Sequence, residues 1–68
     1  MVTVRFRCPS EPSRFATPPE PLLSRVPCIG EHVYMMEFLD DVTWTVGDVV
    51  HLDFADARVH AEVTIERR

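Results

Sequence analysis

The sequence predicts an all-β protein, a small antiparallel barrel or strongly curled sheet of four to five strands. Apolar and polar residues alternate in VTVRFRC near the N-terminus and in RVHAEVTIER near the C-terminus, and this period of two is typical of strands with one buried face. All six prolines fall within residues 9–27, where they exclude a helix. No other segment repeats its apolar residues with a convincing helical period.

The first predicted strand covers residues 2–8. Alternation places its apolar side chains on one face, namely Val2, Val4, Phe6 and Cys8. Pro9 ends the strand, because a proline nitrogen cannot donate to a sheet ladder.

Residues 9–27 are predicted to form a long, rigid loop after the first strand, and apolar residues spaced through it indicate that it lies across the core. Its sequences PSEP and PPEP also match the loose PxxP pattern of polyproline ligands for aromatic grooves. We favour the rigid loop, because the flanking basic residue is only Arg14.

Three more strands are predicted: one that begins near Glu31, one over residues 43–54 and one over residues 58–67, with LDDV and ADA as the turns between them. The apolar rows of the last two strands must point the same way, which sets their register. The predicted opposite pairs are Leu52 with Val59, Val50 with Ala61, Asp53 with Arg58, and His51 with His60. The same reasoning places Tyr34, Met36 and Phe38 opposite Val46 and Trp44.

This register leaves Asp48 pointing inward. The glycine just before it, Gly47, predicts a β-bulge or bend. Strong curling of a long strand is how a small sheet closes into a barrel.

Composition limits the chain to one small domain. Its 68 residues are expected to bury only ~60% of the unfolded surface, so the core gains from a partner subunit. A net charge of −4, from seven arginines against eleven acidic residues, opposes general phosphate binding. The absence of lysine, asparagine and glutamine is typical of a GC-rich genome, bacterial or phage.

Cys8 and Cys28 are too few for a disulfide scaffold and are not in a Cys-x-x-Cys arrangement, so both are expected to be small buried apolar residues. Residues 1–10 contain no signal-peptide apolar region, and no apolar run approaches the ~20 residues needed to cross a bilayer. We therefore expect a cytoplasmic protein with reduced thiols and no membrane association.

Three groups of polar residues could carry chemistry. His51 and His60, with His32, form an alternative metal site, but a structural zinc site normally needs four ligands. We favour exposed, neutral histidines and expect no cofactor. The acids of EFLDD suit a solvated turn. Three serines lack a nucleophile elbow, and a chain this small has little surface for a substrate cleft, so we expect no enzyme activity.

The aromatic residues could stack on bases. However, alternation places them on the apolar face of their strands, so we expect them in the core. The alternative of a nucleic-acid-binding barrel would use the arginines Arg5, Arg7, Arg67 and Arg68.

The segments VPCIGEHVYMMEF, WTVGDVVHLDF and RVHAEVTIER resemble small bacterial and phage β-barrels of SH3-like type. In such barrels a proline–glycine–acid segment leads into the second strand, and meandering strands close the barrel. The resemblance covers Val26 to Arg68 and implies a fold without catalytic residues.

These observations together predict a non-enzymatic, self-associating protein-interaction module. An acidic module of this size could be a phage or mobile-element inhibitor of a host protein. The predicted contact residues are Phe15, Leu22 and Leu23 in the proline-rich segment, with Met35 on the outward face of the second strand.

Overall fold

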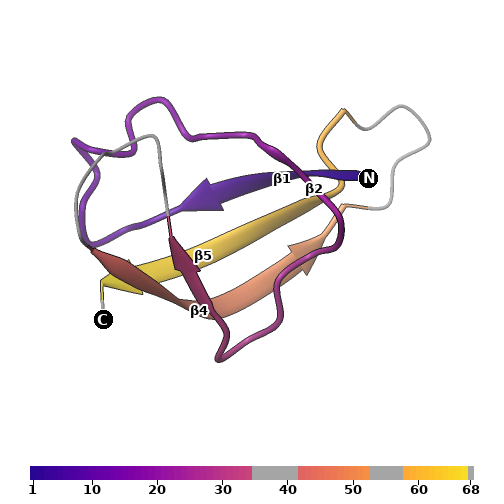
Figure 1. The fold of residues 1–68 in the computed structure, drawn as a ribbon. Coiled ribbons are helices and arrows are strands. Elements are labelled where there is room, and N and C mark those ends of the chain that lie inside the picture. Colours follow the sequence, from indigo (N-terminus) through magenta and orange to yellow (C-terminus); the bar gives the residue numbers. More distant parts are fainter. Residues whose placement is uncertain (35–41, 53–57, 68) are drawn as a thin grey trace.

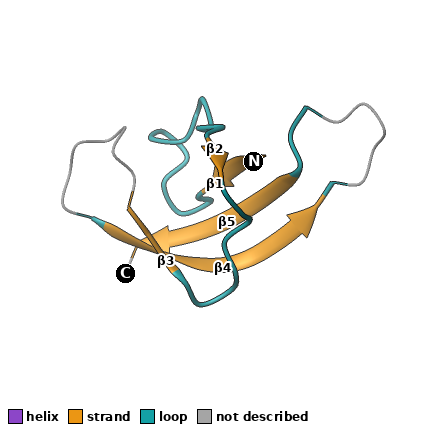
Figure 2. Ribbon diagram, turned by 45° about the vertical axis from the view of Figure 1, so that its right-hand side comes forward, coloured by secondary structure: helices purple, strands orange, loops and turns teal. Residues whose placement is uncertain are grey.

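The computed structural model describes residues 1–34, 42–52 and 58–67, and every regular element in these ranges is a strand. The strands are β1 (Val2–Arg7), β2 (Leu22–Leu23), β3 (His32–Tyr34), β4 (Thr43–His51) and β5 (Ala61–Arg67). They form one sheet in the order β2-β1-β5-β4-β3, which curls strongly into a half-barrel (Figures 1 and 2). The predicted all-β, strongly curled sheet is confirmed.

One pair of strands departs from the all-antiparallel expectation. β1 pairs in parallel with β5, with Val4 beside Ala61 and Phe6 beside Val63. Alternation shows which face of a strand is buried but carries no information about the direction of its neighbour. The sheet is therefore mixed, with the first strand lying beside the last.

The buried face of β1 is as predicted. Val4, Phe6 and Cys8 are buried, and Val2 packs against the same core. Together with Trp44 and Val46 of β4 and the inward residues of β5, they form the centre of the curled sheet.

The proline-rich segment runs back along the outer edge of β1. The N–H groups of Phe6 and Val4 donate to the carbonyls of Pro19 and Pro21, each at 3.0 Å, before β2 begins. Proline can accept such bonds but cannot donate, so it is tolerated at this edge position of the sheet.

Phe15, one of the predicted partner-contact residues, belongs to the core. Its side chain is buried, and its ring meets Trp44 edge to face, with centroids 5.5 Å apart. An apolar residue inside a polar, proline-rich segment can serve the core or a partner equally well, and the sequence alone does not distinguish these roles.

The predicted bulge at Gly47 is confirmed. The pairing between β4 and β5 shifts by one residue between Val46 and Asp48. On the N-terminal side of the shift, Val46 lies opposite Ile65; beyond it, Val49 lies opposite Val63. The extra residue exchanges the two faces of the strand, so Asp48 is exposed and Val49 packs against the core.

The bulge also corrects the predicted register near the end of β4. His51 lies opposite Ala61 rather than His60, and Val50 lies opposite Glu62 rather than Ala61. The prediction located the bulge but kept the same alternation of inward and outward side chains along the whole strand. Asp53 lies outside the described residues, and Arg58 pairs instead with Glu20 at 3.5 Å.

The predicted pairing of β3 with β4 is also wrong. Val33 lies opposite Trp44 and packs against the core, whereas Tyr34 lies opposite Thr43 and is exposed. Met36 and Phe38 lie outside the described residues.

Replacing Phe15 with alanine is expected to lower the free energy of unfolding by about 3–5 kcal/mol, because it removes a buried aromatic ring. Leu22→Ala, at an exposed edge position, should change it by no more than about 0.5 kcal/mol. Urea unfolding of both variants measures the difference. Equal effects would show that Phe15 does not occupy the core.

Candidate functional site

A tight turn at residues 28–31 precedes β3. The N–H of Glu31 donates to the carbonyl of Cys28 at 3.0 Å, and Gly30 has a φ of 89°. A positive φ at the third position is the mark of a type II turn, which favours glycine there. Gly30 also donates to the Val46 carbonyl at 2.8 Å, and Val46 donates to the Glu31 carbonyl at 2.9 Å. The turn is thereby fixed to the middle of β4.

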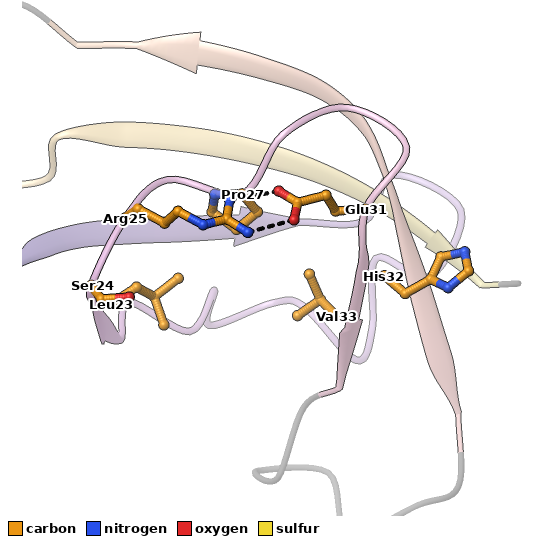
Figure 3. Close-up of a pocket in the computed structure, with 7 residues that line it drawn as sticks. All are labelled: Leu23, Ser24, Arg25, Pro27, Glu31, His32 and Val33. Carbon is orange, nitrogen blue, oxygen red and sulfur yellow. Dashed lines mark hydrogen bonds and ion pairs between the residues drawn. The ribbon is translucent and has the colours of Figure 1, made fainter.

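A carboxylate holds the same turn from its other side. Both oxygens of Glu31 accept from the Arg25 guanidinium, at 2.7 and 2.5 Å (Figure 3). Oε1 also accepts from the Cys28 N–H at 2.5 Å. The Arg25 hydrogen bonds, followed by the Cys28 N–H, lower the pKa of Glu31 to about 2. The hydrogen bonds that Arg25 donates to Glu31 correspondingly raise the pKa of Arg25. Arg25, Cys28 and Glu31 are thus joined in one hydrogen-bonded cluster around the ion pair.

An open hollow of about 510 Å³ lies between this segment and the end of β4. Its lining consists of Val26, Pro27, Cys28, Ile29, Val49 and His51. Val26 and Val49 are half-buried and pack against the core, whereas the Ile29 side chain at the turn is 66% exposed. We call this surface the Ile29 hollow. Its volume lies in the range of about 300–1,000 Å³ that is usual for binding pockets.

The Ile29 hollow is apolar, and no arginine or acidic residue is among the described residues that line it. Two of its lining residues have polar side chains, namely Cys28 and His51. Cys28 is exposed, so the prediction of two buried cysteines holds for Cys8 alone.

The contact residues predicted from the sequence do not gather at this hollow. Leu22 is 61% exposed on β2, while Leu23 is half-buried and packs against the core. Met35 lies outside the described residues. Sequence reasoning missed Ile29, although the order Cys28–Ile29–Gly30–Glu31 has glycine where a type II turn needs it, and that turn exposes the residue before glycine.

The arginines proposed to bind nucleic acid are already paired with carboxylates. Arg5 contacts Glu20 at 2.8 Å and Glu62 at 3.4 Å, and Arg7 contacts the other oxygen of Glu62 at 3.0 Å. Arg67 contacts Glu11 at 2.6 Å and lies over the Trp44 ring. Arg68 lies outside the described residues. A phosphate would have to compete with these carboxylates for each of the three guanidinium groups.

The three histidines occupy separate places. His60 is hydrogen-bonded to Thr3 of β1. Its imidazole Nδ1 accepts from the Thr3 N–H at 3.1 Å, and its backbone N–H donates to the Thr3 carbonyl at 2.8 Å. His51 lines the Ile29 hollow, and His32 lies on β3. Within the described ranges, no three histidine, cysteine or acidic side chains are placed to hold a metal ion together.

Comparison with known proteins gives no match to a family model, a curated protein or a solved structure. The SH3-like resemblance therefore stays an expectation. Over residues 1–34, 42–52 and 58–67, the structure contains no apolar helix of the length that a bilayer crossing needs.

Gly30→Ala is expected to lower the free energy of unfolding by about 1–2 kcal/mol, because an L side chain is strained at positive φ even where space is open. Gly47→Ala is the matched control. The added methyl would meet only the Thr64 carbonyl oxygen, at an ordinary 3.9 Å, so we expect a neutral or slightly stabilising change. Urea unfolding of both variants tests the assignment, and a smaller effect at Gly30 than at Gly47 would contradict it.

Glu31→Gln should destabilise the protein near neutral pH. A depressed carboxyl pKa contributes stability above the unfolded value of about 4.5, and this contribution is lost as pH falls towards about 2. The difference in unfolding free energy between wild type and Glu31→Gln should therefore be constant well above pH 4.5 and shrink as the pH falls through 4.5 towards about 2. Glu66→Gln, at an exposed site in β5, provides the control. A difference that stays constant below pH 4.5 would refute the cluster.

Proposed function

We propose that this protein is a non-enzymatic protein-interaction module that docks its partner at the Ile29 hollow. The observation that supports this most directly is an exposed isoleucine on a turn held by backbone hydrogen bonds and by the Arg25–Glu31 pair. Full burial of an isoleucine side chain contributes about 1.5–3 kcal/mol. A side chain presented by a fixed backbone loses little further freedom on binding.

The hollow beside Ile29 supplies the complementary part of such a surface. Val26 and Val49 give it an apolar wall that packs against the core. The ionised pair of Arg25 and Glu31 lines the neighbouring hollow, and Pro27 lines both hollows. Apolar anchors in pockets, surrounded by a polar rim, carry most of the binding energy in protein interfaces. The partner expected here inserts an uncharged apolar side chain.

The distribution of charge favours a protein partner over nucleic acid. Every arginine in the described residues forms an ion pair with a glutamate. Nucleic-acid binding draws its affinity from basic groups that neutralise phosphates. This protein offers an apolar surface instead of a basic one.

The proposal is tested with a peptide library displayed on phage and selected against the full chain. Enriched peptides should share an apolar anchor, and Ile29→Asp should weaken their binding at least tenfold. Leu22→Asp, which alters an equally exposed leucine on β2, should leave binding unchanged. Both variants must show wild-type thermal unfolding. Peptides that bind Ile29→Asp as tightly as wild type would refute the site, and salt-sensitive DNA or RNA binding would support the alternative.

A further inference from the structure

Resting on the proposed function, we infer that the partner seated on the Ile29 hollow is a second copy of this chain. In this two-fold dimer, the Ile29 side chain of each copy enters the hollow of the other. The half-barrel then gains an apolar cover over Val26 and Val49.

The geometry of the surface suits a symmetric contact. A two-fold interface uses the same patch on both subunits, so the patch must be complementary to itself. The Ile29 side chain is largely exposed and at the same time helps to line the hollow. With a two-fold axis between Ile29 and the hollow, the Ile29 side chain of each copy enters the hollow of the other copy. A hollow without such an exposed side chain would need a differently shaped partner.

Charge also favours a second copy at this place. Two molecules with a net charge of −4 repel each other, so their contact must avoid unpaired charge. The described lining of the hollow has no arginine or acidic residue, and Arg25 and Glu31, which line the neighbouring hollow, form an ion pair with each other. Contact here adds apolar burial without bringing like charges together. Added salt should therefore strengthen the dimer, because it screens the remaining repulsion.

The size of the patch predicts the strength of the dimer. Stable interfaces bury about 800 Å² on each partner, contributed by about 20–30 residues. The Ile29 hollow has a lining of six residues. We therefore expect a monomer–dimer equilibrium that shifts with protein concentration rather than a permanent dimer.

Cys28 provides a reporter that needs no mutation. Cys28 is exposed and is among the residues that line the hollow, whereas Cys8 is buried in the core. A maleimide should therefore label Cys28 alone in the folded monomer. Dimer formation should slow this labelling several-fold as protein concentration rises. The finished adduct should in turn prevent dimerisation, because it occupies the hollow.

The experiment combines sedimentation equilibrium of the full chain over a wide concentration range with maleimide labelling of the same samples. The weight-average mass should rise from monomer towards dimer, and it should rise further at high salt. Ile29→Asp and the milder Ile29→Ser should both remain monomeric, and Leu22→Asp should dimerise like wild type. A protein that stays monomeric at every concentration, or an Ile29→Ser variant that dimerises normally, would overturn the inference.

The same data separate this inference from the proposed function. A monomeric chain that still binds selected peptides through Ile29 retains its function as an interaction module and loses only the second copy as partner. A dimer that depends on Ile29 but binds no peptide supports self-association alone.

Discussion

The arrangement of this protein depends on one inserted residue in its longest strand. Gly47 shifts the pairing of β4 with β5, so the inward face passes from Trp44 and Val46 to Val49. Without that shift Asp48 would face the core, where an unpaired carboxylate is strongly unfavourable. The bulge solves this problem locally. It also brings Val49, together with His51 at the end of β4, to the wall of the Ile29 hollow.

The segment between β2 and β3 forms the opposite wall by different means. It has almost no regular structure, yet the Gly30 and Glu31 backbone groups fix it to Val46, and the Arg25–Glu31 pair closes it on itself. Exposed ion pairs are individually weak, so the backbone contacts set the position and the ion pair narrows the range of conformations. Val46 of β4, one residue before the bulge, is the residue that forms hydrogen bonds with the turn.

The sequence predicts this structure where the physics is local. Alternation identifies the buried face of β1, and the glycine–aspartate step identifies the bulge. The changed parity beyond the bulge, the parallel neighbour of β1 and the inward position of Phe15 depend on contacts between residues far apart in the chain. Of the predicted contact residues, Phe15 is buried in the core and Leu23 packs against it, whereas the exposed apolar residue at the hollow is Ile29.

The exchange of faces at Gly47 is tested most directly by cross-strand nuclear Overhauser contacts between backbone protons of β4 and β5. The bulged register predicts contacts of Val49 with Val63 and of His51 with Ala61. It also predicts that Asp48 lies beside Thr64 on the exposed face. Contacts of Val50 with Ala61 and of His51 with His60 would show an uninterrupted strand, and the Ile29 hollow would then lose the wall that Val49 provides.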